Sequence, residues 1–378
     1  MRRICLFSRP RQPVRPLAEV SLGLIISRPQ LVRFGLMILI SSFLLVGAGC
    51  GQTQVSTADG GVFKSTDSGT KWQQAVGLFS VGQPKSIGSA NVKSLIFDPQ
   101  ASDILYLITQ EGSAFVSYNN AQAWQEIEGL PKGSVNVIIP DPMAKSINYV
   151  AMGGKVFKSL DCCHTWQNIY LEALPTTEIT SLAIDPANNK NILLGLSDGR
   201  LIRSTDGGLN WSTFYTFKAK IKQIIFNPGN NNIIYINTDN QGFWRSGNGG
   251  MNWLNISDSL KNYPGAKQVD LVLLNPSKDD GLVILTSYGI LRSDNGGASW
   301  TDYKLLSPAG RVKITALGFN PKNLNEIYYT ANNTFYRSFD GGNKWQTRPL
   351  PSKRTPSVLL TDPNQTGLIY MGLAGSAK

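Results

Sequence analysis

The chain has 378 residues, of which 42% are apolar and 16% charged, and it contains 37 Gly and 20 Pro. This composition supports a large core, and its Gly and Pro content suits a fold with many short strands and turns. The formal net charge is +11, but residues 1–33 hold seven Arg and one acid, leaving 29 basic and 24 acidic residues, a net +5. That balance does not indicate a nucleic-acid partner.

The first 50 residues are typical of a targeting segment. The arginines precede an apolar or small-residue run from Phe34 to Ala48, which ends at Gly49-Cys50-Gly51. About 15 apolar residues are short for a membrane span of about 20 but fit a secretory signal. The end of this run resembles a bacterial lipoprotein cleavage site with Cys50 as the lipidated residue, although Gly47 stands where a Leu is usual. Two alternatives remain open: an uncleaved N-terminal anchor, or ordinary secretion with Cys50 unmodified. Each alternative predicts an extracytoplasmic protein, because the arginines stay on the inner side.

A motif of eight residues recurs seven times in the rest of the chain. Its pattern is Ser-x-(Asp/Asn)-x-Gly-x-x-Trp, and it holds seven of the eight tryptophans. The Asp or Asn can accept backbone N–H bonds in a turn, the Gly supplies a positive φ, and the Trp can pack between neighbouring sheets. The motif, called the box below, therefore predicts a hairpin turn with a structural role. Its residues are Ser65, Asp67, Gly69, Trp72, Ser117, Asn119, Trp124, Ser159, Asp161, Trp166, Ser204, Asp206, Gly208, Trp211, Ser246, Asn248, Gly250, Trp253, Ser293, Asn295, Gly297, Trp300, Ser338, Asp340, Gly342 and Trp345.

These boxes resemble the Asp-box (BNR) repeats of sialidases, xyloglucan-cleaving glycoside hydrolases, sortilin-type receptors and photosystem II assembly factors. The resemblance covers about residues 59–374. It implies a β-propeller with the boxes on its rim, away from the functional face. It identifies a fold and leaves the activity open.

A second marker alternates with the box. An Asp-Pro or Asn-Pro pair follows one apolar run and precedes another, and Pro there ends a strand and begins a turn. Successive box tryptophans lie 42 to 52 residues apart, which is the period of a four-stranded propeller blade. The pairs begin at Asp98, Asp141, Asp185, Asn227, Asn275, Asn320 and Asp362.

The phase of the two markers predicts how the ring closes. The first box precedes any Asp-Pro pair, and the last pair has no box after it. The chain therefore starts with two outer strands and ends with two inner ones, which complete one another. We predict an all-β fold: a seven-bladed β-propeller of four-stranded antiparallel blades, with a closing blade shared by both chain ends. The predicted division is a leader over residues 1–50, a linker over 51–58 and the propeller over 59–378.

Two boxes depart from the pattern. Asn119 and Ala121 replace Asp and Gly in the second, which predicts a less regular turn there. The third contains Cys162, Cys163 and His164, the only His of the chain. No second Cys/His pair completes a four-ligand zinc site, so we expect a vicinal disulfide or two free thiols, with no metal and no cofactor.

Six boxes have a cation before the Ser. Because the repeat spreads them round the rim, we expect each to cover a Trp face or to pair with a neighbouring blade. They are Lys64, Lys158, Arg203, Arg245, Arg292 and Arg337.

The ligand face is predicted to include the longest connections between blades, residues 75–91 and 256–268. Both join an outer strand to the next inner strand, on the face where propeller ligands usually bind. Their exposed candidates are Lys85, Asp258, Lys261 and Tyr263.

The function class remains open between a binding module and an enzyme. A glycosidase needs two carboxylates about 5–10 Å apart, and nothing in the sequence selects a pair. The catalytic residues, if any, are therefore unknown. We expect a membrane-tethered, non-catalytic scaffold for a protein or polysaccharide of the cell envelope. The alternatives are an Asp-box glycoside hydrolase and a photosystem II assembly factor-like protein. The acids on candidate loops are Glu126, Glu128, Glu172, Glu178, Asp258 and Asp302.

Overall fold

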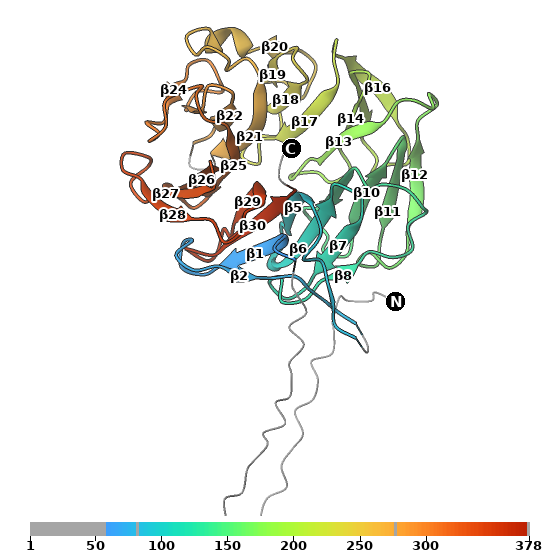
Figure 1. The fold of residues 1–378 in the computed structure, drawn as a ribbon. Helices are drawn as coiled ribbons and strands as arrows, with labels where there is room; N and C mark the ends of the chain where they lie inside the picture. The colour runs from blue at the N-terminus through green and yellow to red at the C-terminus, as the bar shows by residue number, and fades with distance from the viewer. Residues whose placement is uncertain (1–57, 81–82, 276–277, 376–378) are drawn as a thin grey trace, which may run out of the picture. The chain divides into compact units, whose positions relative to one another are not determined.

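A computed structural model describes residues 58–80, 83–275 and 278–375. The predicted leader with Cys50, and the predicted linker except residue 58, lie outside these ranges. Within them, the strands form seven four-stranded antiparallel sheets and one two-stranded hairpin. The sheets are arranged as blades of a propeller (Figure 1), which confirms the predicted fold. In the described residues, no helix combines the length and the hydropathy needed to cross a membrane.

Each of the first four blades is continuous in sequence and runs from the innermost strand to the outermost. Blade 1 is β5 (Val92–Asp98), β6 (Ala101–Thr109), β7 (Ala114–Ser117) and β8 (Gln125–Glu126); blade 2 is β9 (Val137–Pro140), β10 (Asn148–Met152), β11 (Lys155–Ser159) and β12 (Gln167–Leu171); blade 3 is β13 (Ile179–Ile184), β14 (Ile192–Leu196), β15 (Arg200–Ser204) and β16 (Ser212–Thr216); blade 4 is β17 (Ile221–Phe226), β18 (Ile234–Thr238), β19 (Phe243–Ser246) and β20 (Leu254–Asn255).

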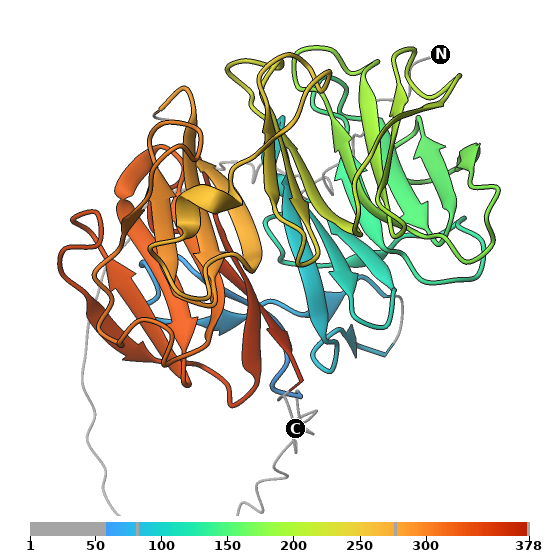
Figure 2. The same cartoon turned by 90° about the horizontal axis from the view of Figure 1, so that it is seen from above.

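Blades 5 and 6 repeat this order, and blade 7 joins the two chain ends. Blade 5 is β21 (Val269–Asn275), β22 (Gly281–Thr286), β23 (Ile290–Ser293) and β24 (Thr301–Asp302); blade 6 is β25 (Ile314–Asn320), β26 (Asn323–Ala331), β27 (Thr334–Ser338) and β28 (Gln346–Pro349); blade 7 is β29 (Thr355–Thr361), β30 (Ile369–Ala374), β1 (Gly61–Ser65) and β2 (Gln73–Gln74). The other described elements are the hairpin of β3 (Gly77–Leu78) and β4 (Lys85–Ser86), and the 3-10 helix η1 (Ser257–Leu260), coiled and yellow in Figure 2.

Blade 7 closes as the phase of the markers predicts. β1 pairs antiparallel with β30, from Gly61 opposite Leu373 to Ser65 opposite Ile369. β30 pairs with β29, and β1 with β2. The first and last described strands of the propeller are therefore neighbours in one sheet.

The described hydrophobic core lies between blades. It divides into seven clusters of buried side chains, and each cluster combines residues of two neighbouring blades. The second strand of most blades is buried on both faces, as in β10, β14 and β18. This explains why those strands are continuous apolar runs in the sequence instead of alternating ones.

The boxes form the predicted hairpin turns. In every described box, the Ser hydroxyl oxygen accepts the N–H of the residue four positions later, at 2.8 to 3.0 Å. The same hydroxyl donates to the Asp or Asn side chain, as Ser204 does to Asp206 at 2.8 Å. The second box obeys this geometry too: Ser117 Oγ accepts from Ala121, whose φ is 61°. The expectation of a less regular turn there is wrong.

Space left by the preceding blade explains how Ala121 is tolerated. A Cβ at Gly208 would lie 2.7 Å from Ile169 Cδ1, and a Cβ at Gly250 would lie 2.5 Å from Phe214. Ile169 and Phe214 each stand three residues after the Trp of the preceding blade. The residue at that position before the second box is Ala75, which packs on the cluster containing Ala121. Its short side chain leaves room for one methyl group.

We therefore expect Gly208→Ala to destabilise the fold by about 2–5 kcal/mol. Gly208 has φ 96°, where a side chain is strained by roughly 1–2 kcal/mol, and crowding of Ile169 adds about 1–3 kcal/mol. Urea unfolding followed by tryptophan fluorescence measures the change. The matched control is Gly229→Ala, where φ is not positive and the nearest atom to a new Cβ is 3.5 Å away. Equal midpoints for the two variants would contradict the steric account.

The box carboxylates give a pH-dependent prediction. The N–H of Asn210, its side-chain amide and the Ser204 hydroxyl lower the pKa of Asp206 to about 2. Similar backbone bonds lower the pKa of Asp67 and Asp340 below the usual 3.8. A pKa lower in the folded than in the unfolded state means that folding favours the ionised form. The contribution of these carboxylates to the stability of the fold is therefore complete above about pH 4 and is lost as the pH falls toward 2.

We expect Asp206→Asn to reduce the difference between the unfolding midpoints at pH 7 and pH 2.5. The Asn side chain can still accept the turn N–H, as Asn248 does from Asn252 at 2.9 Å. Urea titrations at both pH values test this, with Asp258→Asn at an exposed position as the control. An unchanged pH dependence in Asp206→Asn would show that the turn does not distinguish the two ionisation states.

The cations before the boxes face neighbouring blades and aromatic rings. Lys158 donates to Gly207 O in the next blade at 3.1 Å, and Arg337 donates to Ser68 O at 2.9 Å. Five of the cations lie over Tyr or Phe rings, as Lys158 lies over Tyr149, so the expected Trp contact is wrong. The expected alternative, pairing with a neighbouring blade, is confirmed for Lys64, Lys158, Arg245 and Arg337.

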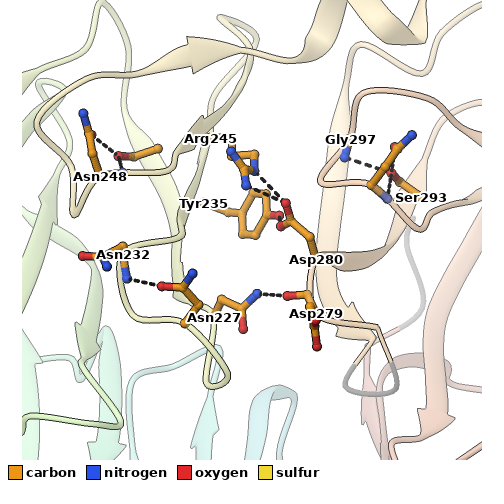
Figure 3. Close-up of polar contacts among 12 residues, drawn as sticks. Asn227, Asn232, Tyr235, Arg245, Asn248, Asp279, Asp280, Ser293 and Gly297 are labelled. Carbon is orange, nitrogen blue, oxygen red and sulfur yellow. Dashed lines mark hydrogen bonds and ion pairs between the residues drawn. The ribbon is translucent and has the colours of Figure 1, made fainter.

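Blades 4 and 5 show such an interface in detail (Figure 3). Arg245, before the box of blade 4, donates through Nε to Asp280 of blade 5 at 3.1 Å, and Tyr235 donates to the same carboxylate. The Asn227 side chain donates to the Asp279 carbonyl. The turn between β21 and β22 is thereby attached to the preceding blade.

Candidate functional site: the channel mouth

A cavity of about 920 Å³ lies at the centre of the propeller. Its walls are the innermost strands of blades 1, 5, 6 and 7, together with Gln223 of blade 4, residues 285–287 at the end of β22 and residues 310–313 before β25. In Figure 1 these strands surround the middle of the ring. We call this space the channel cavity. Its mouth lies where connections from outer strands enter the innermost strands, on the face that the sequence predicts for ligands.

Backbone bulges place polar residues at this mouth. In six innermost strands the pairing shifts around the second residue, or the third in β29, and this residue is left unpaired, a feature that redirects its side chain. The unpaired residues are Lys93, Thr180, Lys222, Asp270, Thr315 and Ser357.

Most of these side chains hydrogen-bond to a carbonyl of the next blade. Together with Asn136 of blade 2, they link five successive interfaces round the channel. The bonds are Ser357 to Val92 at 2.6 Å, Lys93 to Asn136 at 3.1 Å, Asn136 to Ile179 at 3.3 Å, Thr180 to Ile221 at 2.5 Å and Lys222 to Val269 at 3.1 Å.

This series of hydrogen bonds between blades ends at blade 5. Asp270 occupies the position there, and a carboxylate accepts but does not donate. Thr315 of blade 6 bonds instead within its own blade, to the Thr330 hydroxyl at 2.7 Å. Both residues line the channel cavity. The cavity thus includes blades 5 and 6, where the described residues make no such link, and also Lys93 and Ser357, which do make one.

The charge at the mouth is mainly positive. Lys93, Arg311 and Lys313 line the channel cavity and are exposed, whereas Asp270 is the one acid among its described lining residues. Burial and then repulsion from Lys220 lower the pKa of Lys93, and Glu178 partly offsets them. Lys93 is thus a partly desolvated cation that lies near a second cation. An anion placed beside it would be stabilised.

Below the mouth the wall is apolar. Leu271 and Leu273 of blade 5 line the cavity, as do Val358 and Leu360 of blade 7 and Ile96 of blade 1. These five side chains are only partly buried. Each packs on an interblade cluster and leaves part of its surface toward the cavity.

The candidate residues chosen from sequence lie in other places. Lys85 is exposed on β4, in a hairpin whose Leu78 is bridged to Trp124 of the blade 1 box. Asp258 is exposed in η1, with Lys267 Nζ 4.0 Å from its carboxylate, and Lys261 follows η1. Tyr263 donates to Trp300 O at 2.7 Å and packs on Tyr288. None of the four lines the described channel cavity.

The acids considered for hydrolysis are dispersed. Glu172 is buried; although burial alone would raise its pKa, bonds from Arg200 and Tyr170 lower it below its usual range. Arg200 Nη2 lies 2.8 Å from Glu172 Oε1, so this carboxylate stabilises the blade 2 to blade 3 contact. Among the described residues, no hydrogen bond joins any two of the acids that the sequence offered.

The surroundings of the cysteine pair were a candidate metal site in the sequence, and the described residues do not form one. In the part of the chain that the structure describes, no group of three or more Cys, His, Asp or Glu side chains could hold a metal ion. Cys163 is a buried free thiol, whereas Cys162 is disulfide-bonded, so the expectations of a vicinal disulfide and of two free thiols are both wrong. Burial raises the pKa of Cys163, which keeps the thiol protonated and unreactive.

Three kinds of comparison with known proteins bear on this fold. No family model matches the chain. An oligoxyloglucan-reducing end-specific xyloglucanase of Emericella nidulans is 27% identical over 114 residues, which are 28% of this chain and 14% of that protein. Among solved structures, the GH74 xyloglucanase of Xanthomonas campestris matches with a TM-score of 0.60 and 18% identity, over 76% of this chain and 51% of that one.

Two further structures give the same architecture. The GH74 enzyme of Niastella koreensis has a TM-score of 0.61 at 18% identity and covers 79% of this chain and 53% of its own. YCF48 bound to a D1 peptide has a TM-score of 0.57 at 16% identity and covers 75% of this chain and 92% of its own. The present chain thus spans about half the length of these two GH74 enzymes. At these identities the likeness concerns the fold alone, and by that fold the chain is a seven-bladed β-propeller of the architecture seen in xyloglucanases and in YCF48.

Proposed function

We propose that this protein is a non-catalytic scaffold of the cell envelope that binds an anionic segment of a partner protein at its channel mouth. The observation that carries the proposal is that Lys93, Arg311 and Lys313 line one cavity, whose described lining contains a single acid, Asp270. Clustered charge of one sign raises the local concentration of ligands of the other sign and orients their approach.

The relatives support a binding role more than a catalytic one. The YCF48 structure contains a D1 peptide, and the present chain covers 92% of YCF48. The matched part is 51% of the Xanthomonas campestris xyloglucanase and 53% of the Niastella koreensis GH74 enzyme. A propeller that presents a charged central mouth is sufficient for peptide recognition.

Xyloglucan hydrolysis is the second candidate, because the Emericella nidulans relative carries that activity in its name. A glycosidase needs an acid and a second carboxylate on opposite sides of the scissile bond, about 5–10 Å apart. In the described wall of the channel cavity, Asp270 has no second acid beside it. This favours binding over hydrolysis.

The cellular location belongs to the proposal as well. The arginine-rich segment, the apolar run and Cys50 support an extracytoplasmic protein tethered by a lipid or by its leader. Radiolabelled palmitate in a bacterial host should enter the wild-type chain and not Cys50→Ser. Equal labelling of the two would exclude lipidation at this residue.

The binding proposal is tested on the full-length protein in detergent. Immobilised acidic, neutral and basic peptides of equal length are the probes, at low and high salt. We expect the acidic peptides to bind, and Arg311→Glu/Lys313→Glu to weaken binding at least tenfold. Lys261→Glu, on the same face but outside the channel lining, is the matched control.

Two results would overturn the proposal. One is acidic-peptide binding that the double charge reversal leaves unchanged, which would place any interaction elsewhere. The other is release of new reducing ends from xyloglucan oligosaccharides by the wild type, lost in Asp270→Asn. The second result would establish the hydrolytic alternative.

A further inference from the structure

The wall of the channel cavity has an apolar surface that the charged mouth does not explain. Leu271, Leu273, Val358, Leu360 and Ile96 keep partly exposed apolar surface facing one continuous space. Single exposed apolar residues are ordinary, whereas a contiguous apolar surface in a concave space usually marks a ligand site. The volume of about 920 Å³ lies within the range of roughly 300–1,000 Å³ that small-molecule sites occupy.

The polar and apolar parts of the cavity are separated along its depth. Lys93 and Lys313 stand at or before the bulges, at the entrance of the innermost strands. Leu273 and Leu360 lie further along those strands, toward the opposite face. A ligand that satisfies both parts has an anionic end at the entrance and an apolar end inside.

We propose that the channel cavity binds a single-chain anionic amphiphile, with its carboxylate or phosphate head between Lys93, Arg311 and Lys313 and its alkyl tail along Leu271, Leu273 and Leu360. Charge complementarity selects the head, and removal of the tail from water supplies most of the affinity. The site goes beyond the proposed scaffold role, because it requires no partner protein.

Asp270 makes this selectivity testable in the opposite direction. Its carboxylate is the one described acid of the lining and opposes an anionic head. Asp270→Asn should therefore tighten binding severalfold, whereas it would weaken the binding of a cationic amphiphile. The affinity for a neutral ligand would not change in Asp270→Asn.

The experiment uses the full-length protein in phosphatidylcholine nanodiscs, with hexadecanoate that carries a photoreactive diazirine near the end of its tail. After irradiation, mass spectrometry identifies the labelled peptides, so capture by residues 1–50 is recognised and set aside. We expect label on the peptides that contain β21 and β29. Arg311→Glu/Lys313→Glu should reduce this label at least tenfold, and Lys261→Glu should leave it unchanged.

Unlabelled competitors define the chemistry. Burial of each methylene contributes about fourfold in affinity, so hexadecanoate should compete far better than octanoate. Hexadecyl phosphate and hexadecanoate together distinguish a phosphate from a carboxylate head. Equal competition by hexadecyltrimethylammonium would overturn the proposal, as would label absent from β21 and β29 or unaffected by the double charge reversal.

A channel-filling variant gives an independent readout. Ser94 lines the cavity from blade 1 and is partly exposed, so Ser94→Trp should occupy the space of the tail. It should abolish labelling without changing acidic-peptide binding at the mouth, which separates failure of this inference from failure of the scaffold proposal. If Ser94→Trp does not fold, the exposed charge variants decide the question alone.

Discussion

Removal of residues 353–378 is expected to abolish cooperative folding. The deletion takes β29 and β30 from blade 7 and leaves β1 and β2 as an isolated two-stranded ribbon. Val62, which is 0% exposed between these strands, would face water, and two-stranded sheets are marginal on their own. The neighbouring blades lose contacts as well: Thr361 donates to Phe319 O of blade 6, and Ser357 to Val92 O of blade 1.

The measurement is thermal unfolding followed by circular dichroism, together with resistance to trypsin. The truncated chain should show no cooperative transition and rapid digestion. The matched control is a circular permutant of residues 58–375 that joins the two ends with a short Gly/Ser linker and opens at the exposed turn after Asn230. It keeps every described strand and should unfold cooperatively. A truncated chain as stable as the full one would refute closure by blade 7.

The number of blades and the closure could be predicted because their signals are local and repeated. Each box determines its own turn: Ser204 bonds to Gly208 within five residues, and Trp211 reaches back to Ile169 O of the preceding blade at 2.9 Å. Once the repeat unit is known, its phase at the two ends determines which strands must pair. No long-range information beyond the repeat is needed.

Local variation in the repeat was harder to predict. The regular turn around Ala121 depends on Ala75, 46 positions earlier, and the sequence of the box alone does not contain that relation. Likewise, residues 75–91 were expected to be a connection on the ligand face. They instead form the β3–β4 hairpin, in which Gly77 O accepts the Trp124 N–H at 2.8 Å.

The channel mouth was missed for a different reason. Lys93, Asp270 and Lys313 come from three blades separated by up to 220 positions, and they share no motif. A weak signal did exist: a polar residue follows the first apolar residue of most innermost strands, as in Ile221-Lys222. Only the bulge geometry shows that this position faces the next blade and the channel.

The largest single-residue effect is expected for Trp124→Ala, about 3–5 kcal/mol of unfolding free energy. Trp124 is 0% exposed, whereas most other box tryptophans are half-buried. Its indole donates to Ala75 O at 2.8 Å, and its ring belongs to the cluster of blades 7 and 1 with Val76, Ile87 and Tyr370. The β3–β4 hairpin is what covers it, through the bridge to Leu78.

Loss of this ring should therefore have two separable consequences. Urea unfolding reports the global loss, and Trp345→Ala, at a half-buried box tryptophan, is the control with a smaller expected effect. The local consequence is release of the hairpin, since its packing partner is gone. Lys85 is exposed on β4, so trypsin should cleave there faster in Trp124→Ala than in Trp345→Ala under native conditions. Equal stabilities with equal cleavage rates at Lys85 would mean that the hairpin does not depend on Trp124, and that the connection between blades 7 and 1 is held by its backbone bonds alone.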